Sequence, residues 1–151
     1  MVFEFHFERF TPYHKKKVME FLGKLSLHTR EMLSISGIDA KSIYHSFRED
    51  WRITAPVCLY HEQEVIAIGR LSDWDDGLYL SCLVVRDDIQ KKGFGSKLMK
   101  YMFALAILNG SKKMYLEVRT DNPVGISFFK RMGFHTKKEL EMTYLMERKL
   151  T

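Results

Sequence analysis

The chain of 151 residues is poor in cysteine and proline, with 2 Cys and 3 Pro. Both cysteines, Cys58 and Cys82, lie inside apolar runs, where a buried free thiol is the usual state of this residue. The sequence has no CxxC pair and no His/Cys spacing of a structural zinc site, so we expect no bound metal. These absences argue against a disulfide-stabilised secreted module and against a zinc-binding module.

Long hydrophobic runs are also absent. The segment Met1–Phe10 is too polar and too short for a signal peptide or a membrane span. Internal repeats, low-complexity stretches and linkers are absent as well. We therefore expect a soluble, cytoplasmic protein without membrane contact, built as one domain over residues 1–151. A chain of this length buries about two-thirds of its unfolded surface.

The formal charge of +5 is spread along the chain and is not gathered in blocks. A net positive charge is typical of proteins that bind nucleic acid, a membrane surface or an anionic ligand. The sequence contains neither a basic recognition helix nor an RNP-type aromatic motif. A nucleic-acid binder is therefore kept only as a third alternative, and no nucleic-acid partner is expected.

The most informative stretch runs from Leu78 to Asn109. Leu78–Arg86 is almost continuously apolar or β-branched, which predicts a strand covered on both faces. A glycine-containing loop follows, and then apolar residues at helical spacing up to Asn109. The pair Asn109-Gly110 ends this predicted helix, because both residues tolerate the left-handed conformation.

The loop between this strand and this helix predicts a phosphate site. Gly93 and Gly95 allow a sharp turn and a close approach of the backbone to a ligand. The amides from about Lys91 to Ser96 would lie at the positive end of the helix, where anions bind. Lysines add positive charge around them. The expected ligand is a pyrophosphate held by backbone amides.

Two nucleotide-binding motifs were compared with this loop. The Walker string Gly-x-x-x-x-Gly-Lys-Ser/Thr does not occur. A Rossmann fingerprint begins at Gly93 and Gly95, but Leu98 stands where the third small residue belongs. Six residues separate Arg86 from Gly93, which is too long for that turn. Glu117 lies at about the right distance for a ribose-binding acid, so the dinucleotide alternative stays open.

A better match is Gln90–Gly95, Gln-Lys-Lys-Gly-Phe-Gly, which resembles the Gln/Arg-x-x-Gly-x-Gly/Ala signature of the GNAT superfamily of acetyl-CoA-dependent N-acetyltransferases. A second block over Asn122–Phe134 resembles the family's Asn, small residue, aromatic, Gly-Phe series. The positions that match this series are Asn122, Gly125, Phe129, Gly133 and Phe134. The resemblance is strong over residues 78–134. Over the rest of the chain it is weaker and depends on the order of the predicted helices and strands.

Pattern and resemblance predict the same α/β fold with a mixed sheet, in the GNAT-like acyl-CoA N-acyltransferase order β-α-α-β-β-β-α-β-α-β-β. We expect strands 78–86 and 114–119 to be parallel, because a helix crosses between them. The other predicted strands are 2–9, 56–60, 65–71, 134–140 and 142–150. The other predicted helices are 12–28, 40–49 and 122–132, and turns are expected at 61–64 and 73–77.

The resemblance also implies a cofactor site. In GNAT enzymes the central strand and its parallel partner separate, and the pantetheine arm of acetyl-CoA lies between them like an added strand. A main-chain amide near Leu83 or Val84 would hold the thioester oxygen. The residues implied to contact acetyl-CoA are Leu83, Val84, Val85, Gln90, Lys91, Lys92, Gly93, Phe94, Gly95, Ser96, Asn122, Phe128 and Phe129. Asn122 is also predicted to be the N-cap of a helix that begins at Pro123.

Catalytic side chains are not assigned by the resemblance. Where relatives often have a glutamate base, this chain has Tyr79, with Ser81 two residues on along the same predicted face. Asp76, in the acidic turn before it, is a second candidate. Many relatives place a tyrosine acid seven residues after the asparagine, but this chain has Phe129 there, so Tyr144 is a candidate substitute.

The activity implied is direct attack of a primary amine, on a small molecule or a peptide, on the thioester of acetyl-CoA. The acidic turn at 73–77 favours cationic amines. The alternative is a GNAT-fold module that binds acyl-CoA as a sensor or partner module with little turnover, which the phenylalanine at position 129 favours. Relatives frequently pair through their late strands, so the resemblance also admits a homodimer.

Overall fold

The computed structural model describes residues 5–9, 15–32, 57–74, 76–86 and 93–150. The described strands and the last two described helices follow the predicted order, whereas the first two described helices both begin within the predicted helix 12–28. The described helices and strands are β1 (Phe5–Arg9), α1 (Lys15–Gly23), α2 (Leu27–Met32), β2 (Val57–His61), β3 (Glu64–Trp74), β4 (Gly77–Val85), α4 (Phe94–Leu108), β5 (Lys113–Arg119), α5 (Pro123–Arg131), β6 (His135–Glu139) and β7 (Thr143–Lys149). The predicted helix 40–49 lies outside the described residues.

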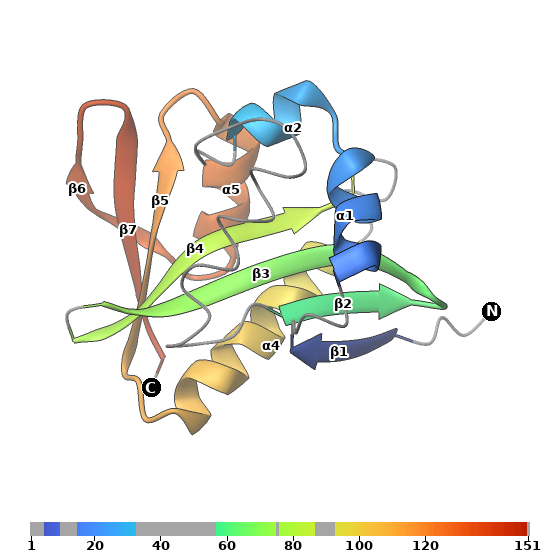
Figure 1. Cartoon of the computed structure of the whole chain (residues 1–151). Helices are drawn as coiled ribbons and strands as arrows, with labels where there is room; N and C mark the ends of the chain where they lie inside the picture. Colours follow the sequence, from blue (N-terminus) through green and yellow to red (C-terminus); the bar gives the residue numbers. More distant parts are fainter. Residues whose placement is uncertain (1–4, 10–14, 33–56, 75, 87–92, 151) are drawn as a thin grey trace.

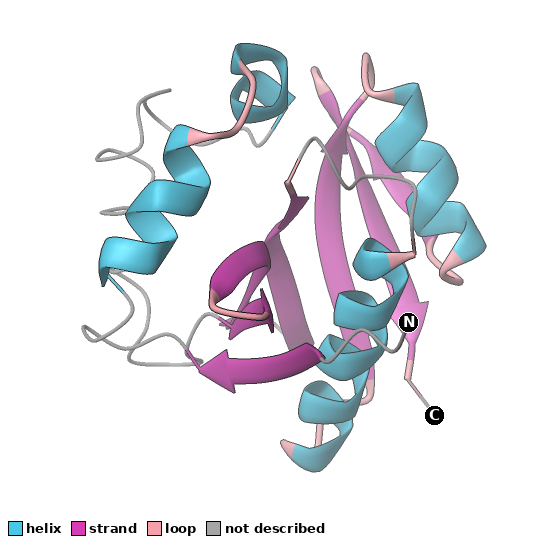
Figure 2. Cartoon of the chain, turned by 90° about the vertical axis from the view of Figure 1, so that its right-hand side faces the viewer, coloured by secondary structure: helices cyan, strands magenta, loops and turns pink. Residues whose placement is uncertain are grey.

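The strands form a single mixed sheet in the order β1-β2-β3-β4-β5-β7-β6. The pair β4–β5 is parallel, as predicted, and every other neighbouring pair is antiparallel. Helices α1 and α2 lie on one side of the sheet, and α4 and α5 lie on the other (Figures 1 and 2). The predicted α/β class with a mixed sheet is confirmed.

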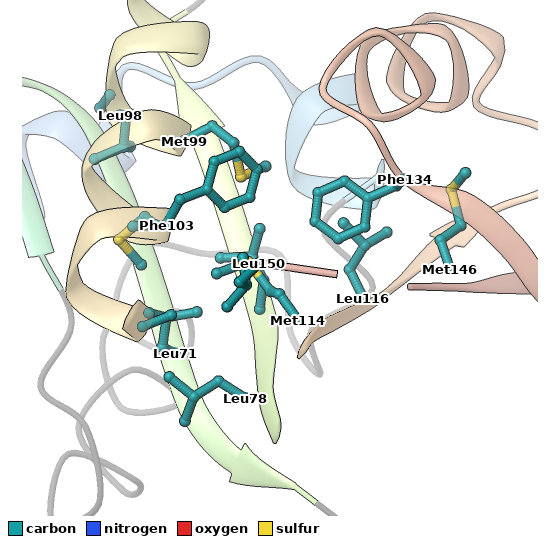
Figure 3. Close-up of a cluster of buried hydrophobic side chains, with 14 of the residues drawn as sticks. Leu71, Leu78, Leu98, Met99, Phe103, Met114, Leu116, Phe134, Met146 and Leu150 are labelled. Carbon is teal, nitrogen blue, oxygen red and sulfur yellow. The ribbon is translucent and has the colours of Figure 1, made fainter. Parts of the chain in front are cut away.

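The larger hydrophobic cluster fills the side of the sheet that faces α4 (Figure 3). Helix α4 buries one stripe, and its fully buried members include Leu98, Met99 and Met102. Phe134, from the loop after α5, stacks at 6.0 Å from Phe103 of α4. A smaller cluster joins α1 to β2, β3 and β4 on the opposite side. Each face of the sheet therefore has its own core.

Two substitutions in α4 test the assignment of its buried stripe. Leu98→Ala is expected to lower the free energy of unfolding by about 3 kcal/mol, because the side chain is completely buried. The melting temperature should fall by roughly 10 °C in a thermal melt. Leu108→Ala, at an 84 % exposed position of the same helix, should change stability by less than about 0.5 kcal/mol. Equal effects of the two substitutions would refute the assigned orientation of α4.

The structure corrects the predicted first helix. One helix was expected up to residue 28, but α1 ends at Gly23 and α2 begins at Leu27. The hydroxyl of Ser26 accepts a hydrogen bond from the backbone N–H of Thr29 at 3.1 Å, which caps a new helix. Apolar spacing continues across the break because Leu25 is still buried. Periodicity alone therefore could not reveal the break.

Strands β3 and β4 also differ from the prediction. Strand β3 continues to Trp74, so the predicted turn at 73–77 is shorter than expected. The register between the strands shifts so that Arg70 pairs with Cys82 and Leu71 with Leu80, which leaves Ser81 as an extra residue. This bulge interrupts the two-residue alternation of β4 between Leu80 and Cys82.

Candidate active site

The parallel strands β4 and β5 separate halfway along their length. Within the described residues their ladder contains only the pairs Leu78–Met114, Tyr79–Tyr115 and Leu80–Leu116. Strand β4 then continues to Val85, paired with β3 on its other side, and β5 continues to Arg119 (Figure 1). The two strands therefore diverge beyond Leu80 and Leu116, in the stretch that contains Leu83 and Val84.

The bulge at Ser81 lies at the point of divergence. Leu80 packs in the core cluster on the α4 side, whereas Val84 packs against α1. Residues four apart in a regular strand share a face, so the extra residue explains the change. Val84 is buried and Leu83 is half-buried. Their side chains belong to the core, and any role in binding an acyl donor would fall to their backbone groups.

Helix α4 begins directly after the glycine loop. Its N-cap is Gly93, with φ 87° and ψ 2°, a left-handed conformation that favours glycine. Gly93 has no side chain that could cap the first turn. The positive end of the helix dipole is therefore not shielded by a capping side chain of the helix itself. Gln90, Lys91 and Lys92 of the predicted signature lie outside the described residues.

Three predicted site segments meet beside this helix start. A Cβ atom placed on Gly95 would lie 3.5 Å from Phe128 Cζ and 3.5 Å from Val85 Cγ2. The end of β4, the first turn of α4 and the middle of α5 are therefore in contact. Phe94 and Ser96 are half-buried at the same place, and the hydroxyl of Ser96 lies 3.7 Å from the sulfur of Met132.

The aromatic residues of α5 form a cluster next to this contact. The ring of Phe129 lies 5.4 Å from Phe128 and 5.9 Å from Phe134. All three rings also contact the core on the α4 side. Phe128 and Phe129 are half-buried, as expected for residues that are partly core.

Asn122 acts as the N-cap of α5. Its side-chain oxygen accepts a hydrogen bond from the backbone N–H of Gly125 at 3.0 Å, and Pro123 follows in the first turn. A Cβ atom on Gly125 would lie 2.6 Å from Asn122 Nδ2, which explains why a glycine stands there. The predicted capping role is confirmed, and contact of Asn122 with a cofactor stays a prediction.

Tyr79 lies on the other face of β4, toward the side of α1 and α2. Burial, with the negative charge of Glu117 as the second cause, raises the pKa of Tyr79 to about 12. The phenol therefore keeps its proton at neutral pH and can donate a hydrogen bond but not accept a proton. This argues against Tyr79 as the general base.

The other two candidates, Asp76 and Tyr144, lie in different surroundings. Asp76 accepts a hydrogen bond from the hydroxyl of Tyr115 and lies 3.5 Å from Lys113 Nζ. The hydrogen bond from Tyr115 is the main cause that lowers the pKa of Asp76. Tyr144 packs against the core on the α4 side, opposite the face of Tyr79. The sheet therefore separates Tyr144 from Tyr79, whereas Asp76 is bonded to Tyr115, the ladder partner of Tyr79.

Sequence reasoning missed Glu117 as a candidate base and considered it only as a ribose ligand. Glu117 is the first residue of β5 beyond its ladder with β4, and its side chain is exposed. The hydroxyl of Thr143 donates to Glu117 Oε2 at 3.1 Å. The alternation of Met114, Leu116 and Val118 in the buried core already implied that Glu117 faces the opposite side.

Three further observations concern the described residues. This part of the chain contains no group of three or more His, Cys, Asp or Glu side chains that could hold a metal ion. None of its helices has the length and hydrophobicity of a membrane-spanning segment. Cys58 is buried and forms no disulfide.

Comparisons with known proteins agree with this geometry. The model of the "Acetyltransferase (GNAT) family" matches residues 25–134. An uncharacterized N-acetyltransferase of Bacillus subtilis, YobR, is 29% identical over 76 residues, which cover 50% of this chain and 31% of that protein. The N-alpha-acetyltransferase 30 of Schizosaccharomyces pombe is 26% identical over 110 residues, 70% of this chain and 73% of the relative.

A solved structure shows the same fold over nearly the whole chain. The PaiA N-acetyltransferase of Thermoplasma acidophilum, in complex with coenzyme A, superposes with a TM-score of 0.79 at 15% identity, covering 97% of this chain and 99% of that one. The family model spans most of the chain and contains both the diverging strands and the glycine loop. The chain therefore belongs to the acetyltransferase (GNAT) family.

Proposed function

We propose that this protein transfers the acetyl group of acetyl-CoA to a primary amine of a small molecule or a peptide. The observation that carries the proposal is the early end of the β4–β5 ladder, at Leu80 and Leu116, beside the contact of Val85, Gly95 and Phe128. An exposed strand edge can pair with an extended ligand such as the pantetheine arm, and a helix N-terminus can bind its pyrophosphate.

In the proposed complex, backbone groups of Leu83 and Val84 pair with the pantetheine arm, and the start of α4 holds the pyrophosphate. Lys91 and Lys92 add positive charge at that end. The amine nitrogen attacks the thioester carbonyl carbon from the face that carries Tyr79 and Glu117. The carbon–sulfur bond breaks, and coenzyme A leaves as the thiolate, because a thiol pKa of about 8.5 makes it a good leaving group.

Glu117 is the proposed general base. An alkylammonium group has a pKa near 10.4, so it must lose a proton before or during attack. Glu117 is an exposed carboxylate at the divergence of the strands, and its orientation is held by Thr143 at 3.1 Å. It takes the proton directly or through one water molecule. Tyr79 remains protonated and serves only as a hydrogen-bond donor.

Phe129→Tyr tests whether protonation of the leaving thiolate limits the rate. The ring stays between Phe128 and Phe134, so the substitution adds a hydroxyl to an existing aromatic cluster. We expect kcat to rise, by up to about 10²-fold, since general acid catalysis has that magnitude or more. An unchanged kcat, measured by thiol release at saturating amine, would show that protonation of the thiolate is not rate-limiting.

The function is tested first by calorimetric titration with acetyl-CoA, with NADH and ATP as controls. Binding of acetyl-CoA alone, followed by release of free thiol with one or more amines in a screen, would support the proposal. Binding of NADH would contradict it and favour the dinucleotide alternative. Tight binding of acetyl-CoA without thiol release across the screen would favour a sensor. The cytoplasmic location and a homodimer remain predictions.

A further inference from the structure

Helix α5 has little buried surface of its own and depends on contacts at its ends. None of its 9 residues is fully buried, although Ile126, Phe128 and Phe129 pack partly against the core on the α4 side. Its first turn is fixed by the cap at Asn122. A helix this short gains little stability from its own hydrogen bonds, so the position of its other end depends on a tertiary contact.

Arg148 of β7 provides that contact. Its Nε donates a hydrogen bond of 2.8 Å to the carbonyl oxygen of Met132, the C-cap of α5. The last carbonyl groups of a helix have no partner within it, and a cation there interacts favourably with the helix dipole. A Cβ atom on Gly133 would lie 2.7 Å from Arg148 Nε. The glycine after the cap therefore leaves the space that the arginine side chain occupies.

The same guanidinium group also contacts α4. Its Cζ lies 4.1 Å from the centroid of the Phe103 ring, and Phe103 is buried. A cation over an aromatic face is attracted to it, and more strongly where water is excluded. Arg148 is half-buried and shares a face of β7 with Met146. One side chain therefore joins β7, the middle of α4 and the end of α5.

The end of α5 lies beside the start of α4, where the proposed pyrophosphate site is. The sulfur of Met132 lies 3.7 Å from the hydroxyl of Ser96, in the first turn of α4. One turn earlier in α5, Phe128 faces Gly95, where an added Cβ atom would lie 3.5 Å from Phe128 Cζ. The part of α5 that Arg148 holds is thus the part that contacts the start of α4.

We propose that Arg148 is a positioning residue for acetyl-CoA. It keeps the end of α5 in place, so that the contact between Phe128 and Gly95 is formed before acetyl-CoA binds. If only a fraction of the molecules has this contact, the apparent Kd rises by the inverse of that fraction. Saturating acetyl-CoA restores the contact, so kcat stays the same. This inference rests on the proposed function for the identity of the ligand.

Arg148→Met tests the proposal, because it keeps an apolar chain near Phe103 and removes both the charge and the hydrogen-bond donor. The Kd for acetyl-CoA, measured by calorimetric titration, should rise about tenfold, a size typical of residues that influence a site without touching its ligand. The kcat at saturating acetyl-CoA should stay within about twofold of the wild-type value. Arg148→Lys keeps a cation near the ring and should raise the Kd by only about threefold. It also reports on the site if the methionine variant fails to fold.

Leu150→Ala is the matched control for loss of stability. Leu150 is buried in the same cluster, two residues beyond Arg148, and its backbone N–H donates to Lys112 O, past the C-terminal end of α4. This substitution should lower the melting temperature at least as much as Arg148→Met and leave the Kd for acetyl-CoA unchanged. Equal increases of the Kd in the two variants would assign the effect to general destabilisation and overturn the inference.

A double-mutant cycle with Phe128→Leu tests whether Arg148 acts through α5. If it does, the loss of affinity in the double variant is smaller than the product of the two single losses, because both changes affect the same contact. Single losses that multiply would show that Arg148 does not act through Phe128, and they would overturn the inference.

The positioning role and the proposed function fail in different ways. A Kd for acetyl-CoA that depends on Arg148, without thiol release in the amine screen, would support the positioning role and contradict the function. Thiol release together with the same Kd in wild type, Arg148→Met and Arg148→Lys would support the function and overturn the inference. A wild-type protein that binds no acetyl-CoA would contradict both.

Discussion

Gly93→Asp is expected to abolish binding of acetyl-CoA while the protein remains folded. The new carboxylate would stand at the N-terminus of α4, where the proposed site holds the pyrophosphate. Juxtaposed like charges in a binding site cost several kcal/mol, so the Kd should rise by more than about 100-fold. The substitution causes no clash with the described residues, because none of their atoms lies within 4 Å of a Cβ placed on Gly93. Calorimetric titration with acetyl-CoA measures the loss.

The matched control is Gly110→Asp. Gly110 has φ 82°, close to the 87° of Gly93, and a Cβ placed there also has no neighbour within 4 Å. Both variants therefore introduce similar backbone strain and the same charge, but at opposite ends of α4. Only the Gly93 variant should lose binding. Both substitutions strain the backbone, but the decrease in melting temperature should be larger for Gly110→Asp, because a carboxylate is unfavourable at the C-terminal end of a helix and favourable at its N-terminal end. Unchanged affinity of Gly93→Asp would refute the phosphate site, and equal losses in both variants would assign the effect to strain or net charge.

Glu117→Gln is expected to lower kcat by roughly 10²–10⁴-fold and leave the Kd for acetyl-CoA unchanged. In the wild-type protein the hydroxyl of Thr143 donates to Glu117 Oε2 at 3.1 Å, and the amide of glutamine keeps an oxygen that can accept this bond. The side chain therefore keeps its orientation but cannot take up a proton. Thiol release at saturating amine and a calorimetric titration together separate these two quantities.

Glu139→Gln supplies the control for this experiment. Glu139 is an exposed glutamate at the end of β6, and its substitution should leave kcat unchanged. Asp76→Asn tests the other acidic candidate. A large loss of kcat in Asp76→Asn with no loss in Glu117→Gln would assign the base to Asp76, against our proposal. A loss of acetyl-CoA affinity in Glu117→Gln would show that Glu117 acts in cofactor binding.

The segments that sequence reasoning predicted well are those with local signals. Gly93 adopts a left-handed conformation that favours glycine, and Asn122 followed by Pro123 is a frequent start of a helix. The helical spacing of apolar residues over 94–108 and the apolar run over 77–85 are likewise recognised from short stretches of sequence. For this reason the element order, the parallel pair and the family were correct, although the first helix was extended across the cap at Ser26.

The composition of the catalytic face was not predictable in the same way. The sequence placed Tyr79 at the position of a base, but burial and the charge of Glu117 make it a phenol that stays protonated. Phe129 signalled a missing acid, yet nothing in the sequence showed that Tyr144 faces the opposite side of the sheet from Tyr79. These properties depend on which strands become neighbours.

The sequence by itself therefore determined the family, the order of the elements and the place of the glycine loop, because backbone dihedral preferences and hydrophobic periodicity act over a few residues. Only the tertiary structure decided where β4 leaves β5, where the bulge at Ser81 shifts the register, and that Glu117 shares a face with Tyr79. Those features arise from pairing between strands far apart in the chain, and a register shift of one residue exchanges the two faces of a strand.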